Sequence, residues 1–329
     1  MPNAKISRRG VALTTAILGM MVALLVPSAA AAVSAPFATV SRYMSTLNTT
    51  TLYNEGCAQG TAAQQTFVAQ NLVVVLDFGG PVAFGNGVYG AKLFNGTTAT
   101  TSTIRDAVEW YAIGFHVCSA IDNSDHLRLA IGTNNSTGAA VGNAAGAAWG
   151  QMINDLNIWA SVNPEGQTVS FAGANDIEPG FGDPIPARAW VTGFDTATNW
   201  SMYNYGSADG CSSIQIPGSD CGTTAHPTWS AEDIYYVSWG AQPCEPLPEV
   251  YLYPPPGNAL QAKQWYWLSK YSIANHGSRF VFAGSMTEHA SDSTTNTAVQ
   301  GWSELYNQVN SDTTTAGSVK WSTDVTHAN

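Results

Sequence analysis

Two acidic residues, Asp176 and Glu178, stand two positions apart at the end of an apolar segment over residues 169–175. Alternate side chains of a β-strand point to the same side, so both carboxylates would project together where the strand stops. Pro179 and Gly180 then end the segment. Paired carboxylates can supply the acid and the second carboxylate that cleave a glycosidic bond, or do acid/base work on another polar substrate. The alternative is a solvated loop whose acids cap the next helix.

Other predicted strands also end beside polar side chains. Asp77 follows the run 72–76, which is apolar on both faces and typical of a buried parallel strand. Glu288 follows a strand expected over 280–284. Five further side chains at or near strand ends are candidates for binding a substrate: Asn134, Tyr203, Tyr205, Trp239 and Tyr251. A tryptophan such as Trp239 is more often part of the core than of a binding surface.

The sequence gives little support to other chemistries. Residues 206–210 miss the G-x-S-x-G nucleophile motif by one position. The six His residues contain no H-E-x-x-H and no pair at ligand spacing, so we expect no metal site built on histidine. A calcium site made of loop carboxylates stays open as an alternative, although no EF-hand loop is present. No G-x-G-x-x-G follows the first strand, so we expect no dinucleotide cofactor.

Strand and helix patterns alternate over residues 71–329, and their connections are too long for hairpins. Such alternation predicts βα units and a parallel sheet. Seven or eight strands in roughly 250 residues favour an α/β fold with a single (β/α)₈-like barrel, irregular after Tyr205. The expected strands are 72–76, 127–132, 168–175, 200–205, 234–239, 249–252, 280–284 and 318–321, and the expected helices are 104–117, 138–159, 186–196, 258–275 and 297–309. Active sites of such barrels lie at the C-terminal ends of the strands, where these acids would meet.

The first 35 residues have the pattern of a secretory signal peptide that is removed. Basic residues precede an apolar run over 11–26, and a region of small residues ends near Ala32 or Ala35. The run is too short to favour a membrane anchor. We therefore expect a secreted, extracellular protein without membrane insertion. Residues 36–70, rich in Ser and Thr, are expected to form a lead-in that packs on the barrel domain 71–329.

Composition narrows the possible partners. The net charge is −11, and removing a signal that carries three basic residues makes the mature chain still more acidic, which argues against nucleic acid and anionic membranes as partners. Only 11% of residues are charged, while the chain has 11 Trp and 13 Tyr. This composition suits secreted proteins that bind sugars, because aromatic faces pack on pyranose rings, and it also occurs in secreted proteins that bind none. The expected partner is a polysaccharide or peptidoglycan; the oligomeric state is not indicated.

Five cysteines follow the signal. An oxidising compartment predicts two disulfide bonds and one free thiol. Cys211 and Cys221 flank a loop rich in Gly, Ser and Pro, and are the first choice for a local pair. Cys57 with Cys118 is the second choice, which leaves Cys244 free.

Two motifs, Leu76-Asp77-Phe78-Gly79 and Asn175-Asp176-Ile177-Glu178, resemble those of the lysozyme-type barrels of glycoside hydrolase family 25 and of related barrels in secreted bacterial proteins. The resemblance covers about 72–290 in layout, and residues 78–81 depart from the family's pattern. In that family the Glu of Asp-x-Glu is the proton donor. The resemblance implies that Glu178 is the acid, with Asp176 and Asp77 as partners. Glu288 could instead be the nucleophile of a retaining arrangement.

Two functions follow as hypotheses. The first is an exported glycan hydrolase in which burial and neighbouring acids raise the pKa of Glu178. The second is a catalytically silent barrel that binds cell-surface polysaccharide. Carboxylates that converge without cationic partners favour the enzyme, and acids neutralised by buried cations favour the silent scaffold.

Overall fold

Eight parallel strands form the central sheet, in the order β10-β11-β1-β2-β6-β7-β8-β9. The computed structural model describes residues 33–66, 68–119, 124–136, 142–252 and 259–328, so almost all of the expected signal peptide lies outside the described residues. The strands are β1 (Ala38–Tyr43), β2 (Asn71–Asp77), β6 (His126–Asn134), β7 (Val169–Asp176), β8 (Met202–Asn204), β9 (Cys244–Pro246), β10 (Phe282–Thr287) and β11 (Val319–His327).

The sheet curls into a nearly closed barrel. The segment after β9 reaches β10, where the Val250 N–H donates to the carbonyl of Met286 and the Met286 N–H donates to the carbonyl of Pro248, both at 2.9 Å. Glu249 and Met286 form an isolated parallel bridge at this seam. The α/β fold with a single irregular (β/α)₈-like barrel, expected from the alternating pattern, is confirmed.

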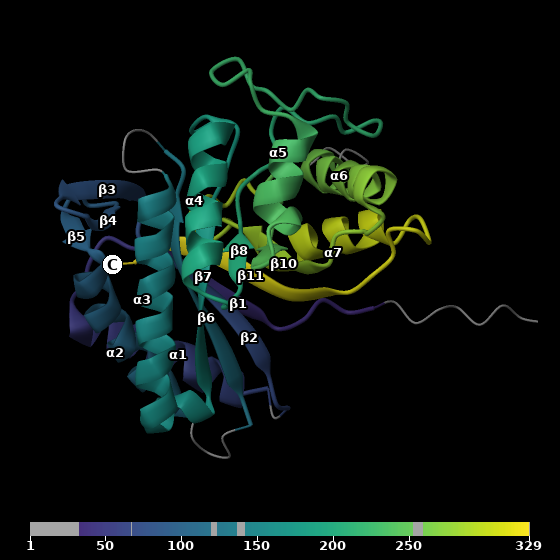
Figure 1. Cartoon of the computed structure of the whole chain (residues 1–329). Coiled ribbons are helices and arrows are strands. Elements are labelled where there is room, and N and C mark those ends of the chain that lie inside the picture. Colours follow the sequence, from purple (N-terminus) through teal and green to yellow (C-terminus); the bar gives the residue numbers. More distant parts are fainter. Residues whose placement is uncertain (1–32, 67, 120–123, 137–141, 253–258, 329) are drawn as a thin grey trace, which may run out of the picture. The chain divides into compact units, whose positions relative to one another are not determined.

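Helices cover the outside of the sheet (Figure 1). They are α1 (Thr49–Gln64), α2 (Thr101–Ser119), α3 (Asn143–Val162), α4 (Pro184–Ala197), α5 (Ala231–Tyr235), α6 (Leu260–His276) and α7 (Ala298–Val309), with a 3₁₀ turn at Pro164–Gln167 and a π turn, η2, at Tyr236–Gly240. The helices α1 and α2 pack together, as do α3 and α4. Their apolar faces bury the outer side chains of the strands, such as Val74, Leu129 and Phe171, in one core.

A second core fills the barrel. Alternate residues of each strand point inward, and small side chains on β6 and β7 leave room for aromatic rings from the neighbouring strands. The inward apolar residues are Val73, Val75, Ala130, Ala172, Ala174, Tyr203, Tyr205, Leu247, Ala283, Met286, Trp321 and Val325. These side chains fill the interior of the barrel, and the acids described below follow them at its C-terminal end.

The segment 36–70, expected as a lead-in, supplies β1 and α1 to the barrel unit. β1 lies between β11 and β2 and pairs with both. Its Ser41 hydroxyl accepts the Val75 N–H at 2.8 Å and contacts the Thr323 hydroxyl at 2.7 Å. The strand was not predicted, because its many Ser and Thr residues do not form an apolar pattern. In the structure their hydroxyls make buried hydrogen bonds instead of facing water.

Three local predictions were wrong. The strand expected over 249–252 is absent, since the strand in this region is β9 and Glu249 makes only an isolated bridge to Met286. Residues 234–239, expected as a strand, form the end of α5 and most of η2. A capping box between Ser230 and Asp233 starts this helix, and Asp233 also forms an ion pair with Arg188 at 2.8 Å. The region 80–100, where no strand was expected, contains a small antiparallel sheet of β3 (Gly80–Gly85), β4 (Val88–Lys92) and β5 (Thr98–Thr100).

Both expected disulfide bonds are present. Cys57–Cys118 links α1 to α2, Cys211–Cys221 closes the loop after β8, and Cys244 is buried and free. These bonds fit the oxidising compartment expected of an exported protein. Across the described residues, we find no helix with the length and apolar character needed to cross a membrane.

Candidate active site

The C-terminal end of the barrel carries acids at the inward positions. On β2 the inward residues Val73 and Val75 are followed by Asp77, and on β7 the inward residues Ala172 and Ala174 are followed by Asp176. The period of two in each strand thus places a carboxylate directly above the apolar interior. Asp77 is 2% exposed and Asp176 is 7% exposed, so both acids are largely removed from water.

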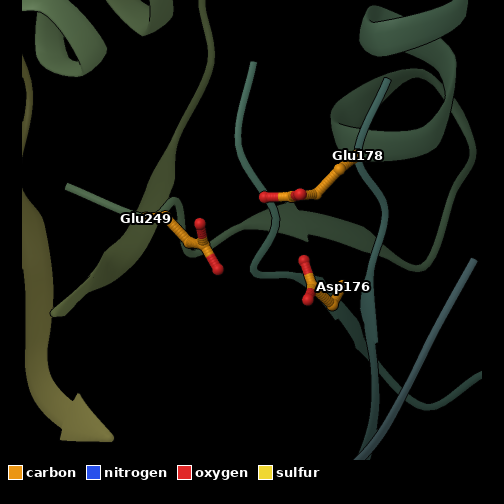
Figure 2. A group of neighbouring side chains, drawn as sticks. All are labelled: Asp176, Glu178 and Glu249. Atoms are coloured by element: carbon orange, nitrogen blue, oxygen red, sulfur yellow. The ribbon is translucent and has the colours of Figure 1, made fainter. Parts of the chain in front are cut away.

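Three carboxylates meet at this end. Asp176, Glu178 and Glu249 each offer an oxygen, and these oxygens all lie within 4.8 Å of one another. Figure 2 shows the three side chains converging from two segments, the end of β7 and the seam after β9. Glu249 is 7% exposed, whereas Glu178 is half-buried and is the most exposed of the three side chains. We call these three residues the carboxylate cluster.

Burial and mutual repulsion raise the pKa values of two acids in the carboxylate cluster. The pKa of Asp176 is raised well above its ordinary value, first by burial and then by the charges of Glu178, Asp77 and Glu288. Its Oδ1 is buried without a hydrogen-bond partner. The pKa of Glu249 is also raised strongly, by burial and then by Asp176 and Glu178. In the described part of the chain, none of these shifts comes from a cationic side chain, which is the arrangement that favours an enzyme.

Asp77 lies beside the carboxylate cluster in a more polar setting. Burial raises its pKa to about 6, although hydrogen bonds from the Gly79 N–H (2.7 Å) and from Tyr205 partly offset that effect. The Tyr205 hydroxyl also lies 3.0 Å from the carbonyl of Thr133, so its single proton is shared between that carbonyl and Asp77. Gly132 leaves the space for this hydroxyl, since a Cβ there would lie 2.7 Å from it. Tyr205 therefore connects the ends of β2 and β6 beneath the acids.

Hydrogen bonds from two loops position Glu178. The side chain of Asn135 accepts the Glu178 N–H (3.1 Å) and donates to the Glu178 carbonyl (3.0 Å). The Ser207 N–H donates to the Glu178 Oε1 at 3.0 Å. The Thr223 hydroxyl, just after the Cys211–Cys221 bridge, donates to the carbonyl of Pro179 at 3.0 Å.

Two tyrosines join Glu249 to Glu288. The Tyr251 hydroxyl is hydrogen-bonded to Glu249 and lies 3.4 Å from the Tyr43 hydroxyl. Tyr43 also donates to Glu288 Oε2 at 3.4 Å. Burial is the main cause that raises the pKa of Glu288. Glu288 therefore borders the carboxylate cluster through the tyrosines instead of belonging to it.

Three of the predicted binding residues lie away from the acids or turn from them. Asn134 is opposite Asp176 in the register of β6 and β7, but its Oδ1 accepts from the Ser136 N–H at 3.0 Å. Tyr203 lies deeper in the barrel, with its ring edge-on to Trp321 at 5.7 Å. Trp239 lies on η2 at the opposite end of the barrel, where its ring packs near Phe280 just before β10. Its expected position at a strand end depended on a strand that is a helix.

Two site residues were missed from the sequence, Glu249 and Tyr43. Glu249 and Tyr251 have the same two-residue spacing as Asp176 and Glu178, so this signal was available. Nothing in the short segment showed that it reaches back to the same end of the barrel. Tyr43 was missed because its strand was not recognised.

Comparisons with known proteins leave the chain without an assigned family. No family model matches it, and neither a curated protein nor a solved structure is significantly similar. The resemblance to glycoside hydrolase family 25 therefore consists of the two short motifs and a barrel with acids at its C-terminal end.

The carboxylate cluster permits two kinds of chemistry. Carboxyl groups about 5 Å apart suit a retaining glycosidase, in which one acts as acid and the other as nucleophile. Three oxygens this close could also bind a hard divalent cation such as Ca²⁺ or Mg²⁺, with Asp176, Glu178 and Glu249 as ligands. None of these three residues is a histidine, whereas catalytic zinc sites usually include at least one histidine ligand.

Proposed function

We propose that the protein is an exported glycan hydrolase that cleaves a glycosidic bond of a polysaccharide or of peptidoglycan. The observation that carries this proposal is the carboxylate cluster at the C-terminal end of the barrel, with its oxygens within 4.8 Å of one another. Three carboxylates this close cannot all be ionised without a large cost in repulsion, so at least one proton stays at the site in neutral solution. A retained proton is what a general acid needs.

The environments of the two glutamates support a division of roles that reverses the one implied by the resemblance. Glu249 is buried, its pKa is raised, and its hydrogen bond to Glu178 contributes to that rise. Glu178 is more exposed and accepts the Ser207 N–H. We assign the proton to Glu249 as general acid, and the attacking carboxylate to Glu178. Asp176 and Asp77, beneath them, keep protons near the site, and Glu288 borders the substrate.

Carboxylate oxygens within 4.8 Å of one another are closer than those of an inverting pair, so we assign retention of configuration. Glu249 donates its proton to the glycosidic oxygen as the bond to the anomeric carbon breaks, and a Glu178 oxygen bonds to that carbon. Glu249, now ionised, then takes a proton from a water molecule whose oxygen replaces Glu178. This second step regenerates both side chains. An inverting enzyme would need its two carboxyl groups about 6.5–9.5 Å apart to admit the water directly.

The test compares Glu178→Gln and Glu249→Gln with the wild-type protein. Purified mature protein is screened against peptidoglycan, chitin, xylan and cellulose for new reducing ends. Each substitution removes a group worth about 10²–10⁴ in rate, so we expect losses of at least about a hundredfold with an unchanged circular dichroism spectrum. Glu109→Gln, on the outer helix α2, is the matched control and should keep full activity. Unchanged turnover in both site variants would exclude the carboxylate cluster as the catalytic centre.

An activated substrate separates the two roles. A dinitrophenyl glycoside of the cleaved sugar has a leaving group that needs no proton. Glu249→Gln should therefore still release dinitrophenolate in a first turnover, whereas Glu178→Gln should not. The opposite pattern would restore Glu178 as the acid. If the wild-type protein binds glycans and cleaves none, the alternative of a silent polysaccharide-binding barrel is correct.

A further inference from the structure

Three aromatic side chains, the half-buried Tyr43 and the exposed Phe94 and His327, border the acids on the side of β1. Tyr43 ends β1, and its ring lies 4.9 Å from that of Phe94 and 5.2 Å from that of His327 at the end of β11. The rings of Phe94 and His327 are 6.1 Å apart. We call Tyr43, Phe94 and His327 the aromatic platform.

The aromatic platform is connected to the catalytic end of the barrel at two points. A Cβ at Gly79 would lie 3.5 Å from the Phe94 ring, so this ring covers the turn whose N–H binds Asp77. The Tyr43 hydroxyl reaches Glu288 and Tyr251, and Tyr251 is bonded to Glu249. The platform thus continues directly from the residues that surround the carboxylate cluster.

The backbone holds Phe94 in place. Its N–H donates to the carbonyl of Met44 at 3.1 Å. Phe94 also lies in a tight turn, which is closed by the Leu93 N–H donating to the carbonyl of Thr97 at 2.8 Å. Phe94 nevertheless remains 43% exposed, and His327 is exposed. Isolated exposed apolar residues are common on protein surfaces, but a fixed ring, grouped with two others beside buried acids, has the composition of a ligand site.

We infer that the aromatic platform stacks a sugar ring of an oligosaccharide whose neighbouring linkage lies at the carboxylate cluster. This inference rests on the glycan substrate proposed above and adds a binding site to it. An aromatic face offers dispersion contact to the apolar face of a pyranose, while the adjoining hydroxyl and carboxylate groups bind its polar edge. Because the platform lies beside the acids and not over them, the substrate must extend past the cleaved bond, which makes an oligosaccharide a better ligand than a single sugar.

The experiment measures binding and turnover in separate proteins. Binding uses the Glu178→Gln protein on an array of β-linked oligosaccharides of one to six units, drawn from chitin, cellulose, xylan and peptidoglycan. The second substitution is Phe94→Ala, with Phe94→Trp to restore a stacking face. Trp200→Ala is the matched control, because Trp200 is 39% exposed but precedes β8 at the opposite end of the barrel. Turnover uses the same substitutions in the protein that retains Glu178.

We expect affinity to rise with oligosaccharide length, to fall about tenfold in Phe94→Ala, and to return in Phe94→Trp. In the active protein Phe94→Ala should raise KM by a similar factor and leave kcat nearly unchanged, because stacking binds substrate and transition state alike. Absence of binding to every glycan, or a loss equal to that in Trp200→Ala, would overturn the inference. Binding that depends on Phe94 without any cleavage by the wild-type protein would support the platform and refute the hydrolase.

Discussion

At the scale of single residues, the spacing of side chains explains how the site forms. The period of two in β2 and β7 puts Asp77 and Asp176 on the inner face, above small or β-branched residues. This much could be predicted from the sequence, because each strand is a continuous apolar run that ends in an acid. Glu249 could not be placed in the same way, since its segment makes only one bridge to β10. Its inward position follows from the closure of the barrel, which is a property of distant contacts.

Asp77 should make stability depend on pH. Its pKa is raised to about 6 in the folded protein, so between about pH 4 and pH 6 the folded state holds a proton that the unfolded chain releases. Stability from this group is full below that range and is lost as the pH rises through it, by about 3 kcal/mol at most. Asp77→Asn stays uncharged and should remove most of this loss, measured by urea unfolding at pH 4 and pH 7.

Asp220→Asn is the control for that comparison, because Asp220 is an exposed residue of the loop after β8. It should show the same pH dependence as the wild-type protein. An Asp77→Asn protein whose stability falls as much as the wild type between the two pH values would show that Asp77 titrates normally.

At the scale of secondary structure, the loop after β8 does more for the site than its composition suggests. It contributes the Ser207 N–H that binds Glu178 and the Thr223 hydroxyl that binds the carbonyl of Pro179. The Cys211–Cys221 bridge closes this loop between those two contacts. A sequence rich in Gly, Ser and Pro predicts a loop, and the two cysteines predict its closure. The contact with Glu178 could not be predicted, because it joins residues on different βα units.

The two disulfide bonds should therefore differ in their effects on activity and stability. Cys211–Cys221 closes a short loop, so replacing both cysteines with Ser should cost about 3 kcal/mol, whereas loss of Cys57–Cys118, with a sequence separation of 61, should cost about 4 kcal/mol. Turnover should show the reverse order. Loss of Cys211–Cys221, in the loop near Glu178, should lower it about tenfold or more, and loss of Cys57–Cys118, between α1 and α2, should leave it almost unchanged. Urea unfolding and initial rates on the cleaved glycan give the two measurements.

Equal losses of turnover in the two double variants would contradict the role of the loop in positioning Glu178. The buried free Cys244 serves as a check, because a Cys244→Ala protein should keep both disulfide bonds and its activity.

Local sequence patterns were misleading where distant contacts decide the structure. Apart from Ser238, residues 234–239 are β-branched or aromatic, and such residues favour strands. The capping box at Ser230 and the ion pair of Asp233 with Arg188 favour the helix instead. The small sheet of β3, β4 and β5 was missed because its glycines suggested a loop, whereas Gly85 and Gly87 adopt the positive φ values of a tight hairpin turn.

At the scale of the whole molecule, β1 connects the two ends of the chain. It pairs with β11 over the six residues from Ala38 to Tyr43 and with β2 at its C-terminal end. Without β1 the barrel would have two open edges, and Tyr43 would be lost from the site. A signal peptide must therefore be cleaved before Ala38 if the exported protein is to fold. The expected cleavage near Ala32 or Ala35 meets this condition.

Truncation tests this dependence directly. A protein that begins at residue 36 should give a cooperative thermal transition and a near-ultraviolet circular dichroism spectrum typical of fixed aromatic rings. A protein that begins at residue 45 lacks β1 and should aggregate or lose that spectrum, because the unpaired edges of β11 and β2 expose hydrogen-bonding groups and buried apolar residues. Mass spectrometry of the exported protein should find an N-terminus before Ala38. An exported, active protein that starts after Tyr43 would show that β1 is not part of the working barrel, and Tyr43 would then have to be removed from the aromatic platform as well.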